Sequence, residues 1–179
     1  PHCISGKVTC MQVTRRFIVR QPVQASLGAA LAGAGVALTS LPAAAQGSKS
    51  ELERNKQTVR DFYDLAFNQS RPREAIERYA GAQYIQHNPE VPDGKEGFIA
   101  YFDALGKRYG NKKRVEFKRL MAEGDQVVAH CRHTFTEWYG ESVWAGMDIF
   151  RLDAHGKIVE HWDVLQKVPS AASNSNGMF

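Results

Sequence analysis

Cysteine is scarce in this 179-residue chain, and its three cysteines are unevenly placed. Cys3 and Cys10 stand near the first residue, which leaves Cys131 as the single cysteine after residue 46. One cysteine cannot form an internal disulfide, so a disulfide-stapled scaffold is excluded for residues 47–179. A segment of this length can bury one hydrophobic core without such cross-links.

The sequence also lacks a strongly apolar run. Its most apolar stretch, Ala25–Leu41, consists of Ala, Gly, Leu and Val diluted by Ser and Thr. A membrane-spanning helix needs roughly 20 strongly apolar residues. We therefore expect no stable membrane span.

The same stretch has the flanks of an export signal. Arginines precede it, and Ala43 and Ala45 follow it as the small residues that a signal peptidase requires. We expect residues 1–46 to comprise upstream residues and a cleaved leader that starts at Met11 and ends at residue 46. The working domain then begins near Gly47 and is periplasmic or secreted from a bacterium.

The export route has two interpretations. The motif Thr14-Arg15-Arg16-Phe17-Ile18 resembles the twin-arginine consensus for folded proteins, and the mildly apolar stretch after it fits that route. The alternative is an ordinary secretory signal in which the two arginines occur by chance.

Residues 47–179 carry no formal net charge. The whole sequence carries a formal charge of +4. Residues 1–46 account for all of it, since they contain no acidic residue and four basic ones, Lys7, Arg15, Arg16 and Arg20. The expected domain is formally neutral, so its charge gives no support for nucleic-acid binding.

Hydrophobic periodicity divides residues 47–169 into helices followed by strands. The predicted helices are 51–68, 72–80 and 95–109, the last with Asp93 as a candidate cap, and the predicted strands are 83–86, 126–139, 142–153 and 157–167. A further strand near Val115 has Leu120 out of phase, which predicts a bulge at Lys118–Arg119. Helices before an antiparallel meander indicate an α+β fold, and we expect residues 170–179 to be a disordered tail.

Strand alternation places two ionisable groups among apolar neighbours. His133 shares a face with Val127 and Cys131, whereas Asp148 shares one with Trp144 and Phe150. Carboxylates are seldom buried without a partner, so Asp148 is a candidate proton-transfer group. The alternative is an edge-strand aspartate that reaches solvent.

Two further histidines have open interpretations. His161 lies on a mixed face of the last strand, where it is either a pocket residue or a hydrogen-bonded structural one. His87 ends a short strand before a Pro-containing loop, which suits the rim of a pocket but also a simple exposed position.

These residues carry a family resemblance. The segments Tyr84-Ile85-Gln86-His87-Asn88-Pro89, Gly97-Phe98, Asp148-Ile149-Phe150-Arg151-Leu152 and Gly156–Asp163 resemble SnoaL-like proteins of the nuclear-transport-factor-2-like superfamily. The resemblance covers residues 51–167. It implies a cone-shaped barrel in which a curved antiparallel sheet and three N-terminal helices enclose one cavity, and it implies homodimers packed through the outer sheet faces.

The resemblance also implies a chemistry. Polyketide cyclases of this group use an aspartate and a histidine for an aldol closure without metal or cofactor, and by position these roles fall on Asp148 and His133. A protonated His133, or a water that it holds, would then stabilise the enolate. The pocket is then expected to contain His87, His161, Tyr84, Trp144, Phe102, Phe135 and Phe150. Its ligand would be a small apolar carbonyl compound, converted by an aldol-type cyclase, lyase or isomerase.

Two alternatives remain. The same fold hosts binding modules that perform no chemistry on a small ligand. A metal site built from His87, His133, His161 and Asp148 would suit zinc or iron. Export also argues against copying the function of intracellular antibiotic cyclases unchanged.

Overall fold

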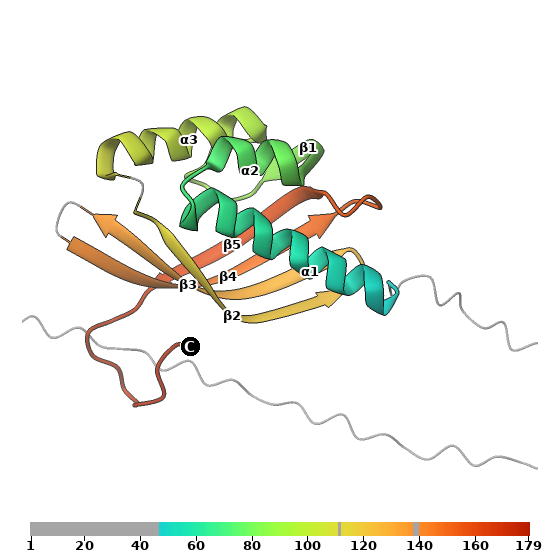
Figure 1. Cartoon of the computed structure of the whole chain (residues 1–179). Coiled ribbons are helices and arrows are strands. Elements are labelled where there is room, and N and C mark those ends of the chain that lie inside the picture. The colour runs from blue at the N-terminus through green and yellow to red at the C-terminus, as the bar shows by residue number, and fades with distance from the viewer. Residues whose placement is uncertain (1–46, 111, 138–139) are drawn as a thin grey trace, which may run out of the picture. The chain divides into compact units, whose positions relative to one another are not determined.

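The computed structural model describes residues 47–110, 112–137 and 140–179. The expected leader lies outside these ranges and stays a prediction. The helices are α1 (Lys49–Tyr63), the π-helical turn η1 (Asp64–Asn68), α2 (Pro72–Tyr79) and α3 (Gly94–Tyr109) (Figure 1). The strands are β1 (Ala80–Gln86), β2 (Arg114–Glu123), β3 (Gln126–Glu137), β4 (Gly140–Leu152) and β5 (Ile158–Lys167).

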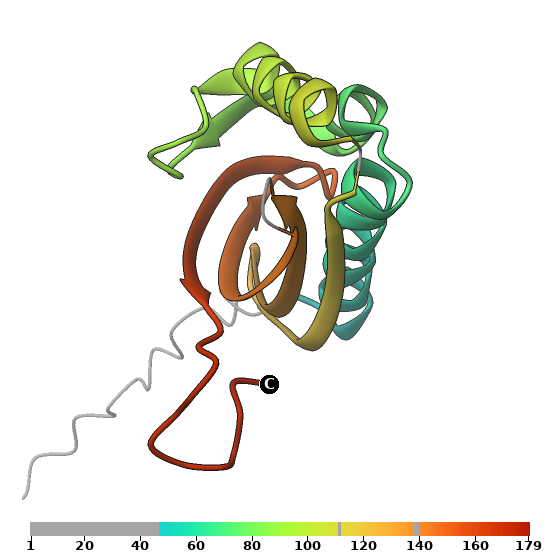
Figure 2. The ribbon, with the colours of Figure 1, turned by 90° about the vertical axis from the view of Figure 1, so that its left-hand side faces the viewer.

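The five strands form one sheet in the order β1-β5-β4-β3-β2. β2 to β5 are an antiparallel meander, whereas β1 pairs in parallel with β5. The sheet is therefore mixed rather than purely antiparallel as expected, because β1 reaches β5 from a distant part of the chain without a hairpin. Figure 2 shows the sheet curling beside the helices, and its edge strands do not pair to close a barrel.

Helix α1 is set by a cap and an apolar stripe. Ser48 and Glu51 form a reciprocal capping box, in which the backbone N–H of Ser48 donates to the Glu51 carboxylate at 2.7 Å. Val59, Phe62 and Tyr63 are buried on one side, as the 3.6-residue spacing predicts. Tyr63 is the last residue of α1 and lies on this buried side, so its side chain points into the interior.

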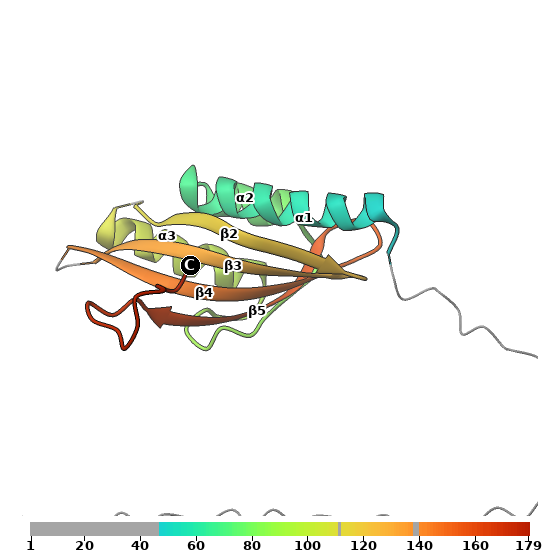
Figure 3. The same cartoon turned by 90° about the horizontal axis from the view of Figure 1, so that it is seen from below.

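The core lies between the helices and the inner face of the sheet (Figures 1 and 3). Its fully buried side chains include Val59, Phe62, Ile76, Val127, Phe150 and Ile158. Removing such a side chain from water contributes about 1.5–3 kcal/mol to folding. The predicted α+β fold of three helices on a curved sheet is confirmed.

The face assignments of the two long strands are confirmed. The buried residues are Val127, Ala129, Cys131 and His133 in β3 and Asp148, Phe150 and Leu152 in β4. Arg132 and Met147 point outward. The register between β2 and β3 shifts between Phe117 and Arg119, at the predicted bulge.

Asp93 plays a different part from the predicted cap. It occupies the position before α3, but its side chain makes no capping hydrogen bond there. Its Oδ1 instead accepts the backbone N–H of Gln86 at 2.8 Å. The end of β1 is thereby tied to the start of α3.

The outer face of the sheet carries exposed apolar side chains. Met147 is 41% exposed and Val164 is 73% exposed. The C-terminal segment turns back beneath the sheet (Figure 3), where the ring of Phe179 stacks on His130 with 5.9 Å between centroids. No helix in the described ranges is long and apolar enough to cross a membrane.

Candidate active site

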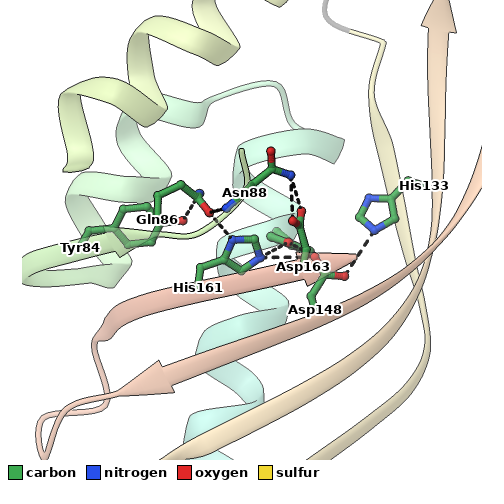
Figure 4. A network of polar contacts seen from close by, with 8 residues as sticks. Tyr84, Gln86, Asn88, His133, Asp148, His161 and Asp163 are labelled. Carbon is green, nitrogen blue, oxygen red and sulfur yellow. Dashed lines mark hydrogen bonds and ion pairs between the residues drawn. The ribbon is translucent and has the colours of Figure 1, made fainter. Parts of the chain in front are cut away.

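Asp148 is the centre of a buried polar cluster. Its side chain is 0% exposed, and its two oxygens contact side chains from three other elements. Tyr63, the last residue of α1, donates its hydroxyl to Oδ1 at 2.5 Å. Nε2 of His161 lies 3.4 Å from Oδ1, and Nε2 of His133 lies 3.4 Å from Oδ2 (Figure 4). The sequence-predicted pair of His133 and Asp148 is therefore in direct contact.

A glycine makes this contact possible. In the sheet register Asp148 stands opposite Ala129, whereas His133 stands opposite Trp144, so the two do not face each other directly. The imidazole of His133 lies over Gly146, where an added Cβ would overlap Nε2 and stand 2.8 Å from Cδ2. The bare backbone lets His133 lean along the sheet as far as Asp148.

Burial and hydrogen bonding set the charges of the cluster. Burial by itself would raise the pKa of Asp148, but hydrogen bonds from His133 and His161 outweigh it and hold the pKa well below its usual range. Burial lowers the pKa of His133, so this imidazole is neutral at pH 7 and is not the protonated donor considered above. Burial, followed by the charge of Asp148, raises the pKa of Tyr63. The Asp148 carboxylate is therefore an anion beside a neutral His133 and a neutral Tyr63 hydroxyl.

The hydrogen bonds of Gln86 fix the tautomer of His161. The backbone N–H of Asn88 donates to Gln86 Oε1 at 2.9 Å, so this atom is an acceptor. Nδ1 of His161 lies 3.0 Å from the same oxygen and must carry a hydrogen to donate to it. Nε2, the other ring nitrogen of His161, faces Asp148.

A second carboxylate stands beside this cluster. Asp163 is directly opposite Asp148 in the pairing of β4 with β5, and atoms of both carboxylates and of the His161 ring lie within 4.8 Å of one another. Nδ2 of Asn88 donates to both oxygens of Asp163, at 2.8 and 3.0 Å. Like charges on opposed residues destabilise a sheet. This arrangement is typical of a functional site rather than of a structural framework.

A pocket opens between α3, the loop after β1 and the inner face of the sheet. Its lining includes Tyr63, Phe67, Tyr84, Gln86, Asn88, Phe98, Tyr101, Phe102, Lys113, Phe135, His161 and Asp163. Its cavity volume is about 80 Å³, so only a small molecule can occupy it. Asp148 and His133 are not part of this lining, and Tyr63 and His161 stand between Asp148 and the pocket.

Most of the predicted pocket residues gather here. His161, Tyr84, Phe102 and Phe135 line the pocket. Phe150 lies beneath it, with its ring centroid 4.7 Å from that of His161. These positions follow from the strand and helix faces that the sequence indicated.

Two predicted pocket residues lie elsewhere. Nε2 of His87 is 2.8 Å from Glu160, and its ring stacks on Trp162 with 4.8 Å between centroids. Successive side chains along an extended strand point in opposite directions, so the inward Gln86 turns its neighbour His87 outward. Trp144 donates its indole N–H to Ser142 at 2.9 Å and is likewise absent from the lining.

The four-residue metal set considered above is not assembled, because His87 is engaged by Glu160. Within the described ranges, two groups have ligand atoms close enough to hold an ion. They are Cys131 with His133 and Asp148, and Asp148 with His161 and Asp163. Elemental analysis of purified protein would test either group.

Several residues of the site were not singled out from the sequence. Tyr63 lies in the predicted helix 51–68 and was given no role, although a buried tyrosine hydroxyl needs a partner. Asp163 shares a strand face with His161, which was a usable signal. Asn88 stood in the motif without a role, and Lys113 sits in a basic run with no periodic pattern at all.

A sequence profile of the SnoaL-like domain matches residues 59–161. The match spans more than half of the chain. The chain belongs to the SnoaL-like domain family. The resemblance drawn from the sequence is thus confirmed, whereas no curated protein sequence matches this SnoaL-like chain significantly.

Solved structures share its fold. A candidate SnoaL-like polyketide cyclase from Jannaschia sp. CCS1 is 20% identical with a TM-score of 0.56, over 67% of this chain and 90% of its own. A candidate polyketide cyclase from Bacillus cereus is 23% identical with a TM-score of 0.57, over 66% and 78%. An epoxide hydrolase of the LEH-like type from M. tuberculosis is 15% identical with a TM-score of 0.55, over 65% and 85%.

Structures named for cyclase and for epoxide hydrolase activity thus share one fold. Identities this low show the fold alone, and a fold does not decide a reaction. The function has to be argued from the site itself.

Proposed function

We propose that this SnoaL-like protein is a cofactor-free enzyme that moves a proton on a small apolar carbonyl compound, in a reaction of the aldol cyclase, lyase or isomerase type. The supporting observation is the opposed pair of carboxylates, Asp148 and Asp163, with His161 beside them at an aromatic pocket. One carboxylate is sealed from solvent and the other reaches the pocket. Different surroundings allow the two carboxylates to take different roles.

Asp163 is the group placed to remove a proton from a carbon next to a carbonyl. It lines the pocket, and Asn88 holds both of its oxygens in one orientation. A base must reach its proton within hydrogen-bonding distance, and Asp163 is the member of the carboxylate pair that a ligand can approach.

Asp148 and His133, the pair implied by the family resemblance, act in this proposal from behind the pocket wall. Asp148 supplies a fixed negative charge beside Nε2 of His161, and His133 keeps that carboxylate oriented. A proton that reaches Nε2 of His161 lies against Asp148. Tyr63 and His161 then connect the buried charge with the substrate, and preorganised groups of this kind stabilise charge that develops during a reaction.

Deuterium incorporation tests the proposal directly. The protein is incubated in D2O with phenylacetone and smaller ketones, and exchange at the carbon next to the carbonyl is followed by NMR. We expect Asp163→Asn and Asp148→Asn each to slow exchange about 100-fold, since a positioned acid or base contributes 10²–10⁴-fold. Asp125→Asn, in an exposed turn, is the matched control. Unchanged exchange in both site variants would refute the assignment.

A non-catalytic binding module is the second candidate. It is favoured by the closure of the network, because both nitrogens of His161 and both oxygens of Asp148 already have partners. A pocket ligand recovered by native mass spectrometry, together with no catalysed exchange on any ketone, would favour this reading.

We also propose that the protein is an exported homodimer. Exposed apolar residues on the outer sheet face support a homodimer. The composition of residues 11–46 supports export, by the twin-arginine route in the first instance. Cell fractionation tests this, and an Arg15→Lys, Arg16→Lys double variant that still reaches the periplasm would contradict the twin-arginine route.

A further inference from the structure

Lys113 brings a positive charge to the wall of the aromatic pocket. Its Nζ lies 3.7 Å from the ring centroid of Phe67, 4.9 Å from that of Phe102 and 5.0 Å from that of Phe135. Lys113 lines the same pocket as His161 and Asp163. The ammonium therefore sits in a cage of three phenyl rings on the ligand side of the fold.

The ring cage satisfies this ammonium only in part. An ammonium has three N–H donors, and ring faces attract its charge without accepting three hydrogen bonds. Within the described ranges, Nζ of Lys113 has no carboxylate or carbonyl oxygen in hydrogen-bonding or ion-pair contact. Lys113 is partly buried, and a charge that is partly withdrawn from water without such a partner is costly to the folded state. An anion that entered the pocket would remove part of that cost.

The electrostatic surroundings agree with this geometry. Burial lowers the pKa of Lys113 to about 8, although Asp148 and Asp163 act in the opposite direction. Lys113 is thus within electrostatic range of both carboxylates. A negative oxygen of a ligand held at Lys113 would leave the rest of that ligand within the small pocket that Asp163 also lines.

We propose that Lys113 is the binding site for an anionic oxygen of the ligand, a carboxylate or the enolate oxygen of a carbonyl compound. The substrate class is then a small keto acid or an acidic dicarbonyl compound whose apolar part contacts the phenyl rings. This inference rests on the proposed function in that the ligand occupies the same pocket. It does not depend on catalysis, since a binding module would use Lys113 in the same way.

Equilibrium binding of two matched probes tests the inference. Phenylacetate and phenylacetamide have nearly the same size and differ in charge, and their affinities are measured by NMR titration of the full chain. We expect the wild type to bind phenylacetate about tenfold more tightly, the value of one charge-assisted hydrogen bond. Bound phenylacetate, unlike phenylacetamide, should also raise the pKa of Lys113 above its free value.

Three variants separate the charge from the packing. Lys113→Met keeps an unbranched side chain among the rings and should lose the preference for phenylacetate, whereas Lys113→Arg should keep it. Lys107→Met removes an exposed lysine of α3 and should leave the preference unchanged. The inference is overturned if the wild type binds both probes equally, if it binds phenylacetate no better than about 10 mM, or if the preference survives Lys113→Met.

The outcomes are independent of the proposed reaction. Loss of the preference in Lys113→Met with no effect of Asp163→Asn on deuterium exchange would support the anion site and refute the catalytic role of Asp163. An unchanged preference with slowed exchange in Asp163→Asn would do the reverse.

Discussion

At the scale of single residues, the site depends on a glycine, which has no side chain to block its neighbour. Gly146 gives His133 the space to lie across the strand and reach Asp148. Steric access and not conformational freedom is the reason for glycine at this position, because its backbone is part of a regular strand. The contact on which Asp148 depends is thus decided by the residue between the partners.

We expect Gly146→Ala to cost about 1–3 kcal/mol of stability, the usual price of overpacking a filled core. The new Cβ would overlap Nε2 of His133, so the imidazole must move. The Cβ would also stand 2.9 Å from Cδ2 of Leu165. Urea denaturation measures the change, and a double-mutant cycle with His133→Ala provides the control. If the cost of Gly146→Ala is the same with and without the imidazole, His133 is not the group that the methyl displaces.

The neutral form of His133 predicts a loss of stability in mild acid. The pKa of His133 is lowered from the ordinary value of 6.5, so below that pH the unfolded chain binds a proton that the folded chain resists. The lowered pKa of Asp148 adds a second loss as the pH falls below 3.8. We therefore expect the free energy of unfolding to fall between pH 7 and pH 5 and again at lower pH.

Denaturant titrations at several pH values check this expectation. The slope between pH 7 and pH 5 should flatten in His133→Gln and persist in His155→Gln, which changes an exposed histidine of the β4–β5 turn. Equal slopes in the wild type and His133→Gln would show that another group is responsible.

At the scale of elements, the junction of β1 and α3 organises the polar half of the pocket. Asp93 holds the backbone of Gln86, Gln86 orients His161, and Asn88 orients Asp163. The first link ties the end of β1 to the start of α3, and the other two run from the end of β1 to the neighbouring strand β5. The parallel pairing of β1 with β5, which the sequence did not reveal, is therefore what places these amides next to the acid–base groups.

This junction predicts the protonation state of one ring atom. We expect long-range ¹H–¹⁵N NMR spectra to show a hydrogen on Nδ1 of His161 at every pH at which the protein is folded. Gln86→Leu should remove that preference and cost about 1–3 kcal/mol, because a buried donor loses its acceptor. Gln83→Leu, on the exposed side of the same strand, should do neither. A neutral His161 protonated only on Nε2 would contradict the network.

At the scale of the whole molecule, the outer face of the sheet is the surface that most needs a partner. Met147 and Val164 are paired across β4 and β5, and both are exposed. Exposed apolar side chains on the outer face of a sheet are typical of an interface between copies. The helices cover the other face (Figure 3), so a dimer through the outer face would leave the pocket accessible.

We expect Val164→Lys to convert a dimer into monomers, because a charge buried in an apolar interface has no partner there. Size-exclusion chromatography with light scattering measures the mass. Ala154→Lys adds the same charge in the exposed β4–β5 turn and should leave the dimer intact. A monomeric wild type, or a Val164→Lys dimer, would rule this interface out.

The sequence by itself determined the elements and the faces. Helical and strand periods are local properties of the chain, so the buried sides of α1, β3 and β4 could be predicted, and with them the burial of Asp148 and His133. The outward direction of the His87 side chain also follows from strand alternation. We could not predict it because β1 ends at Gln86, one residue earlier. The formal neutrality of residues 47–179 and their lack of an internal disulfide likewise follow from composition alone.

Only the tertiary structure decided which polar groups meet. Asp148 contacts Tyr63 and His161 because α1, β4 and β5 converge, and no spacing in the sequence encodes that convergence. The cage around Lys113 draws its rings from separate elements in the same way. Local periodicity fixes which way a side chain points, whereas the packing of distant elements fixes what it reaches, and the chemistry of this pocket depends on the second.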